Sequence, residues 1–348
     1  MRGVEKETKT LFEKRFSDEE KELLYDELVG IYYPEENYKE YLEKIRAVFE
    51  RNKEMFSDLI AVRNLSRQPP HYYGCVKVTN LPVDKEIPWP ESNHCQLKKI
   101  EKKTYVSENA LTLIGMIFGE PYSMYCEGKG LVNNLIPKKC SIKDLTGLGS
   151  NSDLGFHVEN AAARFLPKVD CSPKALMFMG VRQQENPPHT PITDTREALK
   201  LMAKKEIEEL MSSHFRVKLP YRWRNHGENY NILTTDFIPL IEYKEGFLLT
   251  NGAFYGDMLF EPKTTEAERV AQKFKEALET VKFRPIVTPG EIIIVDNRVM
   301  YHSREPFTAL FNEEGHAHRW IQRLFVTEDI SRFADWDIKS DRVFAPKF

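Results

Sequence analysis

The stretch that decides the fold runs from Asp153 to Arg164 and reads DLGFHVENAAAR. It places His157 and Glu159, two side chains that commonly bind metals, two residues apart. Residues i and i+2 of an extended strand project from the same face, so an imidazole and a carboxylate at this spacing can close on one cation. A mononuclear iron site needs one further histidine. We therefore expect a distant histidine to reach this strand.

His302 is the candidate for that third ligand. It follows an apolar segment, Ile292–Val295, and a turn, a placement that can return it across a barrel to the strand of His157. His157, Glu159 and His302 then form a triad of two histidines and one carboxylate, which leaves the remaining octahedral positions for a co-substrate and oxygen. The chain has nine histidines, so the spacing alone is also compatible with an H-x-E pattern that binds no metal.

Composition sets the broad class of protein. The 348 residues are 41% hydrophobic and 30% charged, as in a soluble globular protein. The net charge of −3 gives no indication of binding to nucleic acid or to an anionic membrane. The apolar runs are too short to span a bilayer, and the charged N-terminus has no signal region. We expect a cytoplasmic protein. The five cysteines include no C-x-x-C pair, which favours free thiols.

The order of patterns predicts a β core covered by helices, with no linker or repeat that would divide it. We expect one domain over residues 1–348, of the α+β class and mainly β with helices. A helical segment, residues 1–65, is expected to pack outside the core, and residues 215–247 are a candidate lid. Expected helices cover residues 18–32, 38–60, 107–118, 195–213 and 264–281, and expected strands cover 72–78, 129–136, 175–181, 245–249, 292–295, 299–304 and 319–326.

Two arginines lie close to His302 in sequence. Arg319 and Arg323 are four residues apart in RWIQR, so a strand would point both to one face. Arginine is suited to bidentate binding of a carboxylate. Beside an iron site, the pair would suit one carboxylate of a 2-oxo acid and one of a substrate. The alternative is a pair of exposed edge arginines in weak surface ion pairs.

Three segments together resemble the clavaminate synthase-like oxygenases, which are Fe(II)- and 2-oxoglutarate-dependent. These segments are LGFHVENA at 154–161, PGEIIIVDNRVMYHSREPF at 289–307 and RWIQR at 319–323. The resemblance covers roughly residues 125–326 and points to hydroxylases of free basic amino acids such as lysine and arginine. It implies a double-stranded β-helix, or jelly roll, with a helical jacket.

The resemblance also implies roles for individual residues. His157, Glu159 and His302 would bind Fe(II), Arg319 and Thr190 would bind 2-oxoglutarate, and Arg323, Asn133, Glu159 and Asp257 would contact the substrate. Similar enzymes commonly have glutamine where this chain has Asn133, and threonine where it has Val158. Related halogenases have a small residue in place of the carboxylate, so Glu159 favours hydroxylation. The implied reaction consumes O2 and 2-oxoglutarate, releases succinate and CO2, and hydroxylates L-lysine, or alternatively L-arginine, L-ornithine or another amino-acid-derived metabolite.

Other interpretations involve different residues or a different chemistry. A basic substrate side chain would need an acidic partner, for which Asp236, Glu242, Asp257 and Glu228 are candidates, although each can equally be a solvated acid. His316 and His318 form an H-x-H pair with no evident acidic third ligand. The triad could instead hold zinc in a hydrolase, or belong to a non-catalytic cupin-like binding protein. The expected partner is a small amino acid, and the chain is compatible with a homo-oligomer.

Overall fold

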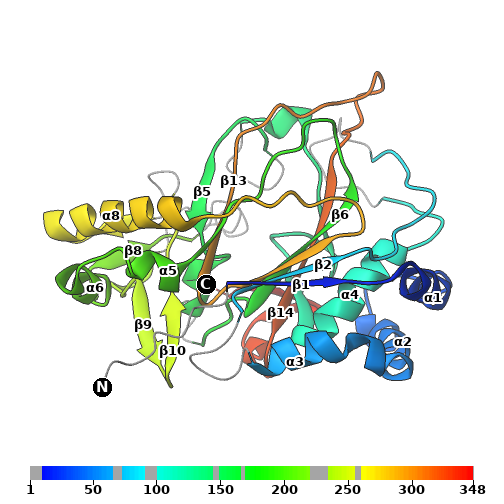
Figure 1. Cartoon of the computed structure of the whole chain (residues 1–348), viewed down its shortest axis with the longest axis horizontal. Coiled ribbons are helices and arrows are strands. Elements are labelled where there is room, and N and C mark those ends of the chain that lie inside the picture. The colour runs from blue at the N-terminus through cyan, green and yellow to red at the C-terminus, as the bar shows by residue number, and fades with distance from the viewer. Residues whose placement is uncertain are drawn as a thin grey trace.

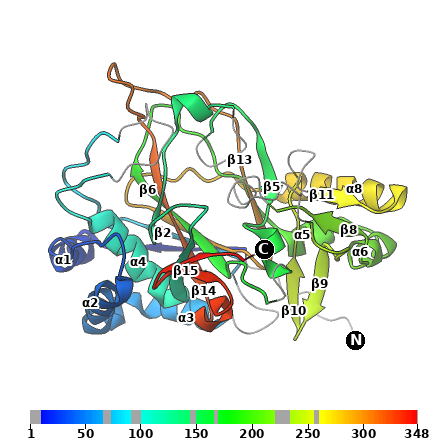
Figure 2. The same ribbon diagram turned by 180° about the vertical axis from the view of Figure 1, so that it is seen from behind.

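The computed structural model shows a large sheet with helices against one face and smaller sheets beyond the other (Figures 1 and 2). Within the described residues, no helix combines the length and apolar character needed to cross a bilayer. The structure describes residues 10–65, 73–90, 100–143, 149–165, 169–219, 234–254 and 260–347.

The large sheet contains nine strands within the described residues, and its pairing is mixed. β1 pairs parallel to β2, whereas β2, β12, β6 and β14 pair antiparallel in that order. The strands, in spatial order, are β1 (Leu11–Arg15), β2 (Cys75–Thr79), β12 (Ile292–Asp296), β6 (Ala175–Arg182), β14 (Trp320–Thr327), β3 (Glu120–Met124), β16 (Val343–Ala345) and β15 (Asp337–Ser340), with β4 (Asn133–Leu135) also paired to β14.

A three-stranded sheet carries the opening motif. β5 (Leu154–His157) and β7 (Ile192–Asp194) pair antiparallel to the two edges of β13 (Met300–Arg304). Two further ribbons lie on the same side of the molecule, together with the long helix that ends at Val281 (Figure 1). The ribbons are β8 (Phe215–Val217) with β11 (Phe260–Pro262), and β9 (Ile241–Lys244) with β10 (Phe247–Thr250).

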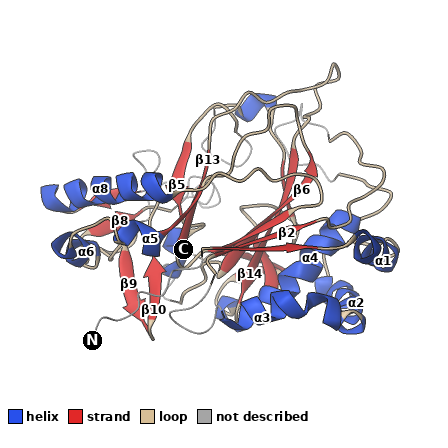
Figure 3. Cartoon of the chain, in the orientation of Figure 1, coloured by secondary structure: helices blue, strands red, loops and turns tan. Residues whose placement is uncertain are grey.

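Helices cover the opposite face of the large sheet, as the colouring by secondary structure shows (Figure 3). α4 packs directly on β14, and a Cβ added at Gly115 would lie 2.5 Å from the Leu324 side chain, so glycine allows this close approach. This helical layer consists of α1 (Asp18–Leu28), α2 (Tyr38–Arg51), α3 (Ser57–Leu65) and α4 (Val106–Phe118). The other helices, α5 (Thr195–Leu199), α6 (Lys204–Leu210) and α8 (Thr265–Val281), lie on the side of the three-stranded sheet (Figure 1). The 3-10 turns are η1 (Lys53–Phe56), η2 (Lys139–Ser141), η3 (Ala161–Arg164) and η4 (Ile330–Phe333).

Strand β6 separates two apolar cores, because its side chains alternate between the faces of the sheet. Ala175, Met177 and Met179 contact the layer of α1 to α4. Leu176 and Phe178 face the other way, towards β5, β7 and β13. All these positions are buried, which explains why the strand reads as one continuous apolar run rather than an alternating pattern. Every second side chain of β6, including Leu176 and Phe178, therefore lines the space between the large and the three-stranded sheet.

The predicted elements agree with the structure in type more often than in extent. The expected α+β composition is confirmed. The helix expected over 38–60 is divided at Asn52. The helix expected over 195–213 is divided at Ala203, which has an extended backbone and precedes a new helix. The strand expected over 129–136 is confined to β4. Much of the candidate lid, residues 220–233, lies outside the described residues.

Among the cysteines that the structure describes, the expectation of free thiols is wrong for Cys140. Cys75, Cys126 and Cys171 are free, with Cys75 and Cys171 buried. Cys140, by contrast, is disulfide-bonded. An odd total count gives no information about which individual cysteines pair, so the sequence argument could not identify this one.

The start of α1 provides a stability prediction. The Ser17 hydroxyl accepts from the Glu20 N–H at 3.1 Å, and the Glu20 carboxylate accepts from the Ser17 N–H at 2.7 Å, so the two residues form a capping box. Ser17→Ala should lower the free energy of unfolding by about 1 kcal/mol, because it leaves a helix N–H without its partner. Urea denaturation measures this, and Ser17→Asp, which can still cap, should retain most of the stability. Equal losses in both variants would contradict the capping role.

Candidate metal centre

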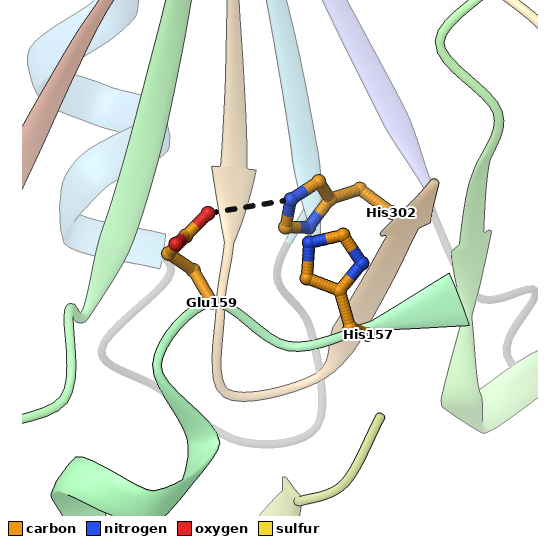
Figure 4. Close-up of side chains that lie close together, drawn as sticks. All are labelled: His157, Glu159 and His302. Atoms are coloured by element: carbon orange, nitrogen blue, oxygen red, sulfur yellow. Dashed lines mark ion pairs between the residues drawn. The ribbon is translucent and has the colours of Figure 1, made fainter. Parts of the chain in front are cut away.

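The three predicted ligands come together from two strands. His157, the last residue of β5, is paired directly with His302 on β13, and the two imidazole centroids lie 4.1 Å apart. β5 ends at His157, so the strand stops two residues before Glu159. The three side chains are buried and point towards one another (Figure 4), with candidate ligand atoms all within 4.8 Å.

The centre lies between the two main sheets. The Phe178 ring, from the inner face of β6, has its centroid 5.7 Å from that of His302. Among the described residues, this is the one group of three or more histidine, cysteine or carboxylate side chains arranged to hold a metal ion. His316 and His318 are not part of it: His316 pairs with Glu314 at 3.3 Å and the His318 ring contacts Trp89.

The hydrogen bond made by His157 prepares it for metal binding. Its Nδ1 lies 2.9 Å from the carbonyl oxygen of Gly155. A carbonyl can only accept, so the Nδ1 carries the proton and the Nε2 lone pair is available to a cation. Metal-binding histidines commonly have their second nitrogen fixed in this way. The buried Nδ1 of His302 has no hydrogen-bond partner among the described residues.

Glu159 is held in its charged form. Burial raises the pKa of this carboxyl, but the Arg323 guanidinium and the two imidazoles outweigh burial and hold the pKa well below its usual range. Its Oε2 lies 3.3 Å from Arg323 Nη1 and 3.6 Å from His302 Nε2. A deprotonated carboxylate beside two imidazole nitrogens is the donor set that suits Fe(II) in a facial triad. The residues present therefore fit the expected metal.

Arg323 has a second acidic neighbour that the sequence did not indicate. Its Nη2 donates to Glu127 at 2.9 Å and to the Asn133 Oδ1 at 3.3 Å. The Glu127 side chain is fully buried and that of Arg323 is 4% exposed. Arg323 thus lies beside the candidate triad, with its Nη1 3.3 Å from the Glu159 Oε2. In this structure its guanidinium is already paired with two carboxylates, and nothing in the loop containing Glu127 distinguishes that residue by pattern.

Arg319 differs from Arg323 in making no ion pair with an acid among the residues that the structure describes. Desolvation and the nearby Arg304 cation lower the pKa of the Arg319 guanidinium. Within the described residues it makes a cation–π contact with Phe307, at 5.3 Å, and no hydrogen bond or ion pair. Arg304 donates to the carbonyls of Gly149 and Ser152. Two guanidinium groups held close together favour a bound anion.

The remaining predicted residues vary in how much the structure shows of them. Thr190 is buried two residues before Ile192, which pairs with His302. The amide nitrogen of Asn133 donates to the Ser123 hydroxyl and the Gly130 carbonyl. The other predicted residues fall into two groups: Asp236 is exposed and Glu242 half-buried, while Asp257 and Glu228 lie outside the described residues.

The fold is that of solved iron oxygenases. No protein-family model matches the chain. An asparagine oxygenase solved with Fe(II), (2S,3S)-3-hydroxyasparagine and succinate matches with a TM-score of 0.80 and 20% identity, over 97% of this chain and 100% of that one. The non-heme iron oxygenase OrfP, solved with Fe and alpha-ketoglutaric acid, matches with a TM-score of 0.77 and 19% identity, over 96% and 100%. OrfP with Fe, succinate and (3S)-hydroxy-L-Arg gives 0.75 and 17%, over 96% and 99%.

Curated relatives are similarly distant in sequence. The L-asparagine oxygenase of Streptomyces coelicolor is 24% identical over 268 residues, which are 74% of this chain and 72% of that protein. The enduracididine beta-hydroxylase of Streptomyces hygroscopicus is 21% identical, over 74% and 78%. The L-lysine 3-hydroxylase of Catenulispora acidiphila is 22% identical, over 79% and 73%. The resemblance to oxygenases of free amino acids is confirmed.

Proposed function

We propose that this protein is an Fe(II)- and 2-oxoglutarate-dependent oxygenase that hydroxylates an unactivated C–H bond of a free amino acid. The observation that carries the proposal is the buried triad of His157, Glu159 and His302, with its carboxylate charged and the His157 Nδ1 held by the Gly155 carbonyl. The relatives with this fold support it, because their names and bound molecules include iron, succinate and hydroxylated amino acids. The two facing sheets are then the halves of a jelly roll, in one oxygenase domain.

Each residue of the candidate centre has a proposed role. His157, Glu159 and His302 would hold the iron, which when bound supplies the oxygen chemistry that no side chain can provide. Burial of all three excludes bulk water from the reacting atoms. The fixed proton on His157 Nδ1 keeps that ring in one orientation. A carboxylate at position 159, instead of a small residue, favours hydroxylation over halogenation.

The guanidinium of Arg319, which has no ion pair within the described part of the chain, is the proposed partner for the distal carboxylate of 2-oxoglutarate. A cation that is desolvated and repelled by Arg304 becomes more stable when a carboxylate binds it. Thr190 lies beside the His302 strand and is the proposed hydroxyl contact to the same molecule. Both assignments require the co-substrate to lie on the β7–β13 side of the metal.

Arg319→Met should raise the 2-oxoglutarate concentration needed for half-maximal turnover roughly a hundredfold, because truncating one partner of a buried charged pair costs on the order of 3 kcal/mol. Without 2-oxoglutarate the variant should be at least as stable as wild type, since it removes a desolvated cation. Succinate release at increasing 2-oxoglutarate concentrations tests the first expectation. Thermal melts without 2-oxoglutarate test the expected stability. An unchanged requirement for 2-oxoglutarate would refute the assignment.

The proposed substrate is a free basic amino acid, with L-lysine first and L-arginine and L-ornithine as alternatives. Arg323 and Asn133, with Glu159 and Asp257, are the proposed contacts. Because Arg323 is already paired with Glu127 and Glu159, a substrate carboxylate would have to displace or share one of these acids. The relatives act on asparagine, enduracididine and lysine by name, so asparagine belongs in any screen.

Two other functions use the same residues differently. Zinc at the triad would make a hydrolase, which has no use for the Arg319 cation or for 2-oxoglutarate. A non-catalytic cupin-like protein would bind its ligand without turnover. The neighbouring cations of Arg319 and Arg304 favour the oxygenase, because a hydrolase needs no second anion site beside its metal.

The direct experiment supplies Fe(II), 2-oxoglutarate, O2 and one free L-amino acid at a time, and measures succinate together with the mass of the amino acid. Lysine, arginine, ornithine and asparagine form the first panel. We expect one of them to stimulate succinate release and to gain one oxygen atom, without chlorine incorporation in chloride buffer. The proposal would fail if no free amino acid stimulated succinate release above the rate without substrate.

A further inference from the structure

Asn297 holds the backbone of Glu159 from both sides. Its Oδ1 accepts from the Glu159 N–H at 2.7 Å, and its Nδ2 donates to the Glu159 carbonyl at 3.0 Å. The same Nδ2 donates to the Pro173 carbonyl at 3.1 Å. Asn297 is 1% exposed, so water does not compete for these groups. Both amide hydrogens of the side chain are therefore committed, one to the candidate metal ligand and one to the chain before β6.

Glu159 needs such a partner because the sheet ends before it. His157 is paired with His302, and the Val158 N–H donates to the Gly252 carbonyl at 3.1 Å. Beyond that point β5 has stopped, and the left-handed Asn160 turns the chain into η3. A buried peptide without partners is costly. The carboxamide of Asn297 offers one donor and one acceptor, as a strand neighbour would, and so replaces the missing strand.

The anchor itself is fixed. Asn297 lies in the turn between β12 and β13, and its own N–H donates to the Lys174 carbonyl at 2.9 Å. Asp296 accepts from the Arg298 backbone N–H at 3.0 Å and pairs with its guanidinium, which holds the turn closed. Only five positions separate Asn297 from His302 (302 − 297). The amide thus connects the candidate carboxylate ligand to the same β12–β13 turn that leads to the histidine.

We propose that Asn297 is a positioning residue for the metal centre, which sets the placement of Glu159 relative to His302. The inference rests on the proposed metal function of the triad. Residues that orient metal ligands through hydrogen bonds typically change metal affinity about 10- to 100-fold when they are removed. We expect Asn297→Ala to weaken divalent metal binding within that range.

A merely structural role predicts something different, and Asn109 provides the control. This asparagine is also fully buried, and its Nδ2 donates to the carbonyls of Leu28 and Ile31 at 2.9 and 2.8 Å. It lies on α4, in the helical layer on the far face of the large sheet. Asn109→Ala should lower thermal stability without changing metal affinity.

The test titrates metal-free protein with Co(II) and follows the visible absorption of the bound ion in wild type, Asn297→Ala, Asn297→Asp and Asn109→Ala. Aspartate has the same shape but cannot donate to the Glu159 and Pro173 carbonyls, so it keeps one bond of three. We expect both Asn297 variants to bind Co(II) at least about tenfold more weakly, and Asn109→Ala to stay within about twofold of wild type.

Each other outcome has a defined meaning. A folded Asn297→Ala or Asn297→Asp protein with wild-type Co(II) affinity overturns the positioning role, as does an equal loss in Asn109→Ala. If neither Asn297 variant folds, the residue serves folding alone and the inference is wrong. If wild type itself binds no Co(II) while folded, the proposed metal function fails instead, so the two failures are distinguishable.

Discussion

Replacing His302 by alanine is expected to lower turnover at least about 10³-fold while the protein remains folded, since a catalytic metal contributes several kcal/mol to the reaction. His302 is buried at the junction of β13, β5 and β7, and it is one of only two imidazoles in the triad. Two remaining ligands do not define a facial site. Metal content after dialysis against Fe(II) or Co(II), measured together with succinate release, tests the expectation.

His316→Ala is the matched control for His302→Ala, because that histidine pairs with Glu314 outside the triad. It should retain wild-type metal content and activity. Unfolding would also abolish the activity of His302→Ala, so circular dichroism should confirm the fold of both variants. Undiminished metal binding in folded His302→Ala would contradict the triad.

Arg323→Met is expected to lower the free energy of unfolding by about 3–5 kcal/mol, which is typical when one partner of a buried ion pair is removed. The change leaves the carboxylates of Glu127 and Glu159 buried and facing a neutral side chain. Glu127→Gln in the same chain should recover part of the loss, because one of the two buried carboxylates that faced the guanidinium is then neutral. Urea denaturation of the metal-free proteins gives both numbers.

The stability lost in Arg323→Met should depend on pH in a defined direction. In wild type the Glu159 pKa is depressed, so this carboxyl stabilises the fold above its unfolded pKa of about 4.3 and the contribution is lost as the pH falls. Without Arg323, burial is no longer offset by that guanidinium and protonation of Glu159 is less unfavourable. The stability difference between wild type and Arg323→Met should therefore shrink towards acidic pH. A loss below about 1 kcal/mol at neutral pH would indicate a solvated pair instead.

The sequence indicates how His157 and His302 come together because each lies on a strongly patterned strand. The apolar run before His302 and the extended motif around His157 fix which elements they occupy, and antiparallel pairing then places the two imidazoles opposite each other. The continuous apolar run of β6 likewise identifies a strand buried on both faces. Local pattern and long-range pairing agree at these positions.

The residues that the sequence missed act through contacts that no local pattern records. Glu127 reaches Arg323 from 196 positions away, and Asn297 reaches Glu159 from 138 positions away. Both are ordinary polar residues in loops when read alone. The interruption of the predicted helix at Asn52 and the disulfide at Cys140 also depend on tertiary context. Periodicity and spacing in the sequence predict the strands, whereas the polar contacts around the centre can be identified only from the three-dimensional structure.

The most direct test of whether the triad binds Fe(II) together with 2-oxoglutarate is an anaerobic titration of the protein with both. The titration is followed by the visible charge-transfer absorption of a chelated iron–2-oxo acid complex. Wild type should develop this band at one equivalent of iron. Arg319→Met should need much more 2-oxoglutarate to produce it, and His302→Ala should not produce it. A wild-type protein that binds Fe(II) without forming the band, or a band of full strength in His302→Ala, would contradict the account.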